Sequence, residues 1–147
     1  MIKMMVVGLP MMVFCLMIQV SATYWSVRNY ARQVARSNRG SGFVAGSIPL
    51  VVALLVMMVG NIVQIALWGG LFLILGEFDA PFEAIYHSTV NFASLGYGDI
   101  VMSARWKLLG ALEALNGVVM LGMTGAALMS IMQHMIRQQR RADGFED

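Results

Sequence analysis

Charged residues are scarce in this sequence. Only 12% of the 147 residues are Asp, Glu, Lys or Arg, whereas 59% are hydrophobic. Soluble domains average roughly 45–50% apolar and about 25% charged residues. The composition therefore excludes an ordinary soluble domain and predicts an all-α membrane protein, because helices satisfy their own backbone groups in lipid.

Cysteine is almost absent. Cys15 is the single cysteine, so an intrachain disulfide is impossible, and no Cys/His cluster predicts a metal site. The sequence also lacks a nucleophile–base pair and a phosphate-binding loop. We therefore expect no enzyme, no resident cofactor and no nucleic-acid partner.

Three apolar runs have the length of membrane spans, since a span needs about 20 residues. We expect transmembrane helices over residues 1–22, 48–75 and 106–135. The first run has a second interpretation as a cleaved signal peptide, with Lys3 as its charged start.

The connection over residues 23–47 carries four arginines and no acid, which predicts a cytoplasmic location. Arg28, Arg32 and Arg36 recur every four residues, and Arg39 falls near the same helical face. We expect a basic amphipathic helix at the headgroup level, with a solvated basic linker as the alternative.

No basic residue lies between Arg39 and Arg105, and the second span is followed by acids at Glu77, Asp79 and Glu83. Arg137, Arg140 and Arg141 follow the last span, and the latter two belong to a short tail over residues 139–147. The pattern predicts a multi-pass protein of the inner cell membrane, with the N-terminus and the acidic loop outside and the C-terminus in the cytoplasm.

Residues 81–93 predict a helix that is too short to cross a bilayer. It leads directly into Ser94-Leu95-Gly96-Tyr97-Gly98-Asp99. Glycine tolerates positive φ, and its alternation with L-residues lets successive carbonyls point toward one axis. Four copies would then form rings of oxygens that replace the hydration shell of a monovalent cation. The alternative is a glycine turn between two helices.

This hexapeptide resembles the selectivity filter of potassium channels, commonly Thr-Val-Gly-Tyr-Gly-Asp. The wider stretches Tyr86–Ile100 and Trp106–Gly117 resemble the two-helix pore domain of the potassium channel superfamily, especially small bacterial members. The resemblance covers residues 48–138 and leaves the first span as an extra helix. It implies a homotetramer in membrane lipid, with outer helix 48–75, pore helix 81–93, filter 94–98 and inner helix 106–135.

The resemblance also implies the ion ligands. Potassium would be held by the carbonyls of Ser94, Leu95, Gly96 and Tyr97 together with the Ser94 hydroxyl, and Gly98 completes the filter. Serine replaces the usual threonine, and leucine replaces valine or isoleucine. A weakly selective cation channel and a non-conducting accessory subunit therefore stand as alternatives to a potassium-selective channel.

Two sets of polar side chains are expected to support the filter. The resemblance implies a hydrogen bond from Tyr86 to Asp99, the alternative being a solvated Asp99 at the pore mouth. Glu113 is an ionisable group inside a span, which is costly, and Asn61 and Gln64 lie at a similar depth. We expect Glu113 to bond to these amides or to the pore helix through Ser88 or Asn91. A proton sensor and a cation site lining the pore are the other interpretations.

One face of the inner helix is expected to line the cavity. The family pattern places five residues on it: Val119, Gly122, Ala126, Ser130 and His134. Close packing of small residues between helices is the alternative. His134 is either an acid-sensitive gate at the cytoplasmic mouth or an interfacial side chain.

Overall fold

The computed structural model describes residues 2–36 and 43–142, which form four α-helices and no strand. The helices are α1 (Ile2–Arg36), α2 (Phe43–Ile74), α3 (Pro81–Phe92) and α4 (Lys107–Ala142). α1, α2 and α4 are each long and apolar enough to cross a membrane, whereas α3 has only 12 residues. The expected all-α membrane fold with three spans and one short helix is confirmed.

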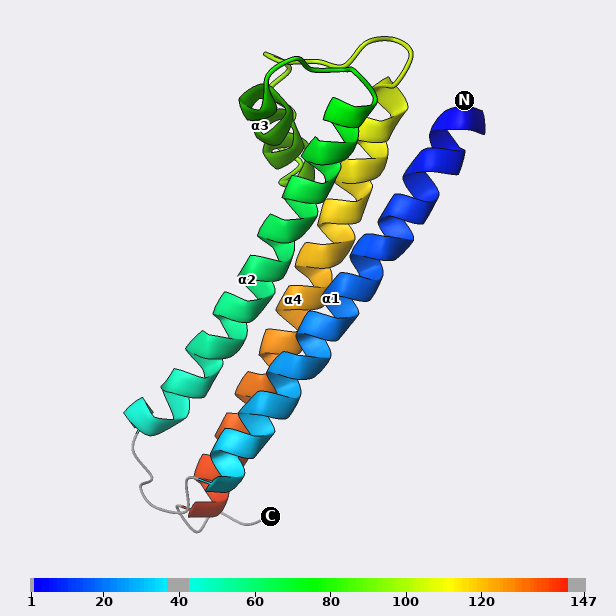
Figure 1. Cartoon of the computed structure of the whole chain (residues 1–147). Coiled ribbons are helices and arrows are strands. Elements are labelled where there is room, and N and C mark those ends of the chain that lie inside the picture. Colours follow the sequence, from blue (N-terminus) through cyan, green and yellow to red (C-terminus); the bar gives the residue numbers. More distant parts are fainter. Residues whose placement is uncertain (1, 37–42, 143–147) are drawn as a thin grey trace.

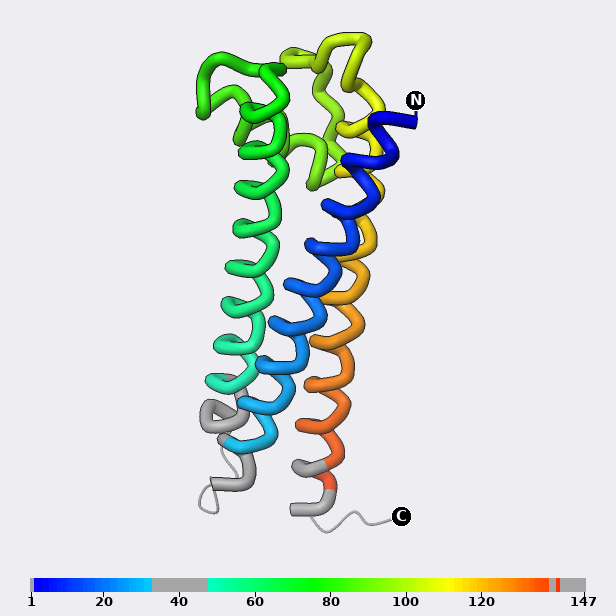
Figure 2. Tube along the Cα trace, turned by 45° about the vertical axis from the view of Figure 1, so that its right-hand side comes forward, coloured from blue at the N-terminus to red at the C-terminus, as the bar shows by residue number. Residues whose placement is uncertain are grey.

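The three long helices lie side by side, and α3 packs at one end against α2 and α4 (Figure 1). Between α2 and α4 the chain enters the bundle through α3, turns, and leaves at the same end (Figure 2). The N-terminus lies at that end as well, and the C-terminus lies at the opposite end. The arginines of α1 and α4 are therefore remote from the short helix and its following loop.

The end of α1 differs from the expected one. We expected the span to end at Ala22 and a separate surface helix or linker to follow. Instead, α1 is a single helix through Arg36. No glycine or proline occurs in residues 23–36, so nothing in this stretch interrupts the helix. Ser26 and Tyr30 are buried, and Tyr30 lies against Ala53 of α2 and Ile131 of α4, so the extension packs along both of these helices.

The other helix boundaries shift as well. α2 begins at Phe43, ahead of the expected Ile48, and Pro49 lies inside it. α3 begins with Pro81 at its first helical position, where the missing N–H costs nothing, and ends at Phe92. α4 continues through Ala142, so it includes the first part of the expected tail. The predictions for residues 37–42 and 143–147 lie outside the described residues.

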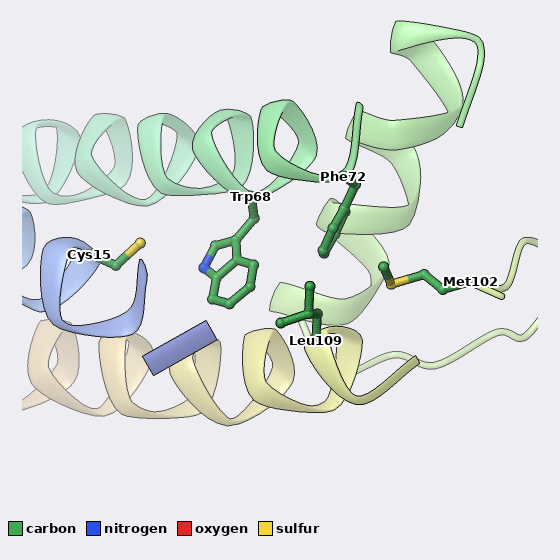
Figure 3. Packing of buried hydrophobic residues seen from close by; sticks show 5 residues of the cluster. All are labelled: Cys15, Trp68, Phe72, Met102 and Leu109. Carbon is green, nitrogen blue, oxygen red and sulfur yellow. The ribbon is translucent and has the colours of Figure 1, made fainter. Parts of the chain in front are cut away.

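A cluster of buried side chains joins the three long helices and the loop before α4 at the short-helix end (Figure 3). It comprises Cys15 of α1, Trp68 and Phe72 of α2, Leu109 of α4, and Met102 from the loop before α4. A second cluster at the opposite end joins Tyr30, Ala53 and Ile131. Lipid tails are as apolar as these side chains, so close packing rather than escape from water holds the helices together.

Candidate functional site

Glycines allow α3 to lie unusually close to its neighbours. A Cβ atom at Gly110 of α4 would lie 3.0 Å from the Asn91 amide nitrogen, and one at Gly117 would overlap the carbonyl of Phe92. Gly69 of α2 faces α3 at a similarly short distance. These glycines therefore allow the C-terminal end of α3 to pack closely between α2 and α4.

The stretch after α3 has an alternating backbone. φ is +57° at Ser94, +59° at Gly96 and +74° at Gly98, whereas Leu95 and Tyr97 have negative φ. Residues of positive and negative φ in alternation let successive peptide carbonyls turn to the same side of the chain. Ser94 adopts the left-handed region without being glycine, at a cost of roughly 1–2 kcal/mol. Such backbone strain tends to persist at functional sites.

The start of this stretch is anchored to α3. The Ser94 amide donates to the Asn91 carbonyl at 2.8 Å, and the Leu95 amide donates to the Val90 carbonyl at 2.9 Å. Beyond this anchor the chain is open, with 53% of Leu95 and 65% of Tyr97 exposed. Peptide carbonyls are the available ligands here. Within the described part of the chain, no three His, Cys, Asp or Glu side chains are grouped as a metal site.

Tyr86 connects α3 to the residue that follows the stretch. Its hydroxyl donates to Asp99 Oδ2 at 2.7 Å, so the bond expected between these residues is present. Because this bond favours the ionised carboxylate and the protonated phenol, it lowers the pKa of Asp99 and raises the pKa of Tyr86. The loop that leaves the stretch is thereby tied to α3.

Hydrogen bonds between Glu77 and Ser103 form a second connection within the loops, which the sequence did not predict. Glu77, just after α2, accepts hydrogen bonds from the backbone amide and the hydroxyl of Ser103, both at 2.7 Å. These two bonds join the segment before α3 to the segment before α4. Glu77 was visible in the sequence only as one of several acids in the outer loop.

Glu113 is fully buried in α4, and its carboxyl contacts α3. Oε1 is hydrogen-bonded to the Ser88 hydroxyl, and Oε2 accepts from the Asn91 amide at 3.3 Å. Of the two expected partner sets, the structure therefore has the α3 pair, Ser88 and Asn91. Gln64 points toward α1 instead, and the buried side-chain oxygen of Asn61 has no hydrogen-bond partner among the described residues.

His87 extends these contacts toward the loop. Its Nε2 lies 2.8 Å from the Asn91 amide nitrogen, and its Nδ1 lies 2.9 Å from the carbonyl oxygen of Ile100. The ring packs between Phe72 and Phe78, with centroids 5.7 and 5.1 Å away. Burial among these rings lowers the pKa of His87, although the bond to Ile100 opposes that effect. A neutral imidazole therefore links α3 to the chain directly after Asp99.

Gln19 of α1 is the polar residue that sequence reasoning missed. Its side-chain oxygen accepts from Gln64 of α2 at 2.8 Å, and its amide donates to the Thr124 hydroxyl of α4 at 2.8 Å. Gln19 and Gln64 are both fully buried. An amide inside an apolar span was already the signal that identified Asn61 and Gln64, and it applies equally to Gln19. This bridge attaches α1 to both α2 and α4.

The face of α4 that was expected to line a cavity is largely uncovered within the chain. Val119, Gly122, Ala126 and Ser130 are all exposed. A Cβ at Gly122 would meet nothing within 4 Å. His134 differs from the others, because its ring makes an edge contact with Tyr30 of α1 at 5.9 Å. The cavity role of these residues stays a prediction.

Comparison with known proteins adds one match. A family model described as "Ion channel" matches residues 51–134, which is more than half of the chain and includes α3 and the alternating backbone. No curated protein and no solved structure matched the chain. α1 precedes the matched region entirely.

Proposed function

Because the chain belongs to the ion channel family, we propose that it is a potassium-selective channel in which four copies surround one pore. The permeant ion would be dehydrated potassium, held by the carbonyls of Ser94, Leu95, Gly96 and Tyr97 and by the Ser94 hydroxyl. Several adjacent sites let each ion bind strongly enough to lose its water and weakly enough to leave.

The alternating φ along Ser94–Gly98 is the observation that carries this proposal. A glycine turn between helices requires one or two left-handed residues, not three in strict alternation with right-handed ones. Such an alternation allows consecutive carbonyls to face one side, which is what a row of cation sites would require. The C-terminal end of α3 adds a partial negative charge next to the row.

The exposure of the stretch supports an assembly of several copies. Irregular backbone at membrane depth is tolerated only where protein buries it or water surrounds it. In one chain, residues 93–99 are all exposed. Copies arranged around a common axis would cover them and close the carbonyls into rings. Four copies is the number that the family resemblance implies.

The charge distribution supports an orientation for this multi-pass membrane protein. Arginines of α1 and α4 lie at one end and the acidic loop lies at the other. We therefore place the basic end in the cytoplasm of an inner cell membrane, and the N-terminus and filter loop outside.

Weaker selectivity is the second candidate, and the residues at two filter positions favour it. Serine at 94 lacks the methyl group that restricts a threonine rotamer, and Leu95 packs differently from valine. Reversal potentials in mixed potassium and sodium separate the two candidates. If purified protein in liposomes passes no ions, an accessory subunit replaces both.

Flux through liposomes that contain purified protein tests the proposal, and two glycines provide a matched pair. A Cβ at Gly96 or Gly70 would meet nothing within 4 Å, but only Gly96 has positive φ. We expect Gly96→Ala to reduce potassium flux and selectivity, because alanine disfavours that conformation by roughly 1–2 kcal/mol. Gly70→Ala should conduct as the wild type does. Equal behaviour of the two variants would refute the filter assignment.

A further inference from the structure

The number of hydrogens available for the hydrogen bonds around Glu113 indicates whether its buried carboxyl is protonated. Ser88 Oγ lies 2.7 Å from the carbonyl oxygen of Ile65 in α2, and it is also hydrogen-bonded to Glu113 Oε1. A hydroxyl has one hydrogen, and a carbonyl has none. The contacts of Ser88 Oγ with Ile65 and with Glu113 therefore need one hydrogen more than Ser88 can provide.

Only Glu113 can supply that hydrogen. If Ser88 donates to Ile65, the hydrogen between Ser88 and Glu113 belongs to the carboxyl. If Ser88 donates to Glu113 instead, two oxygens without a hydrogen face each other at 2.7 Å. A carboxylic acid at Glu113 satisfies both contacts, because its O–H donates to Ser88 and its other oxygen accepts from Asn91.

The hydrogen bonds that run from Glu113 through Asn91 and His87 to Ile100 are consistent with a protonated Glu113. The Ile100 carbonyl can only accept, so Nδ1 of His87 carries the hydrogen and Nε2 accepts from Asn91. The Asn91 amide then uses its two hydrogens for His87 and Glu113. Every hydrogen between α4 and Ile100 is assigned once when Glu113 and His87 are both neutral.

Among the residues that the structure describes, none that bonds to the Glu113 carboxyl is a cation, and α2 carries no charged residue. The titratable group of α3 on this side is His87, which is linked to Glu113 through Asn91 and interacts electrostatically with Asp99 and Glu77. The titratable group of α1 near Glu113 is Cys15. The hydrogen-bond partners of Glu113 are Ser88 and Asn91, and neither is a cation. A buried carboxylate without a cation is strongly disfavoured.

We propose that Glu113 is a carboxylic acid in the conducting protein. In this state it is a positioning residue that holds α3 through Ser88 and holds the backbone at Ile100 through Asn91 and His87. This role presupposes the conduction proposed above. Removal of the proton at alkaline pH breaks the contact around Ser88, loosens the support behind the filter and reduces flux.

Infrared spectroscopy and flux measurements together test the proposal. We expect wild-type protein at neutral pH to show a neutral-carboxyl C=O band that shifts when glutamate is labelled with ¹³C. The band should persist in Glu77→Gln and Glu83→Gln and disappear in Glu113→Gln. Absence of any such band overturns the proposal, and it does so even if Glu113→Gln fails to assemble.

The pH dependence of flux distinguishes this proposal from a purely structural role, which would leave flux independent of the protonation of Glu113. Glutamine keeps one donor for Ser88 and one acceptor for Asn91, so Glu113→Gln should conduct within about twofold of wild type at neutral pH. Wild-type flux should fall as the pH rises through the titration of Glu113. The Glu113→Gln flux should stay level.

An assembled Glu113→Gln that has lost flux at neutral pH, or that keeps the alkaline fall, contradicts the proposal. If the wild type passes no ions, the proposed channel function fails, and the carboxyl band still decides the protonation state separately.

Discussion

The close approach of α4 to the end of α3 makes Gly117→Ala the sharpest test of the packing described above. The new Cβ would overlap the Phe92 carbonyl oxygen and lie 2.7 and 2.9 Å from the Phe92 carbonyl carbon and Cα. Ordinary van der Waals contact begins near 3.4 Å. All three atoms belong to backbone, so no side-chain rotamer can relieve the overlap and the helices have to separate.

Two opposing effects set the expected magnitude. Alanine is a better helix former than glycine by about 1 kcal/mol. Overpacking of a close contact costs typically 1–3 kcal/mol, and more where backbone has to move. We therefore expect Gly117→Ala to lower the free energy of unfolding by about 1–2 kcal/mol. Since Ala93 and Ser94 follow Phe92 directly, the proposed potassium selectivity should fall as well.

Gly122→Ala is the matched control on the same helix. A Cβ there meets nothing within 4 Å of the chain, so only the gain in helix propensity remains. We expect this variant to be more stable than the wild type by up to about 1 kcal/mol. Equilibrium unfolding of both variants in detergent measures the difference. Equal stabilities, or an unchanged selectivity in Gly117→Ala, would refute the close-contact reasoning.

Three further predictions concern hydrogen bonds. Gln19→Leu should destabilise the fold by about 1–2 kcal/mol, because it leaves the buried Gln64 amide unpaired, while adding Gln64→Leu should recover part of the loss; a double-mutant cycle without coupling would argue against the bridge. Tyr86→Phe should weaken the outer end of the filter by roughly 1 kcal/mol and speed the decay of potassium flux in sustained recordings, and an unchanged decay would show that the bond supports nothing. Glu77→Ala removes both bonds to Ser103 and should lower stability by about 1 kcal/mol, which thermal unfolding measures against Glu83→Ala as the control.

Much of the architecture was predictable because its causes are local in the chain. Uncharged runs of sufficient length, interrupted by acidic or basic segments, are enough to predict three spans. Residues 81–93 are too few to cross a bilayer, and α3 indeed has 12 residues. The glycines at 96 and 98 predicted positive φ, and both have it. The bond from Tyr86 to Asp99 also followed from the resemblance.

The end of α1 was not predicted, because the arginines indicate a change of environment after Ala22. Charge indicates where a helix meets water, but it does not end the helix. Residues 23–36 contain no glycine or proline that would weaken the helix there, and α1 continues through Arg36. The buried side of the extension, with Tyr30 against Ile131, depends on a partner helix about a hundred residues away.

Local sequence thus determined which segments cross the membrane and where the backbone turns left-handed, since length, charge and the missing Cβ of glycine act without reference to the rest of the chain. Tertiary packing alone decided which polar groups meet inside the bundle. Gln64 could have faced Glu113 or α1, and the rotation and depth of three helices directed it to Gln19. The same packing placed Glu113 against Ser88 and Asn91, because a hydrogen bond between distant helices exists only once their relative positions are set.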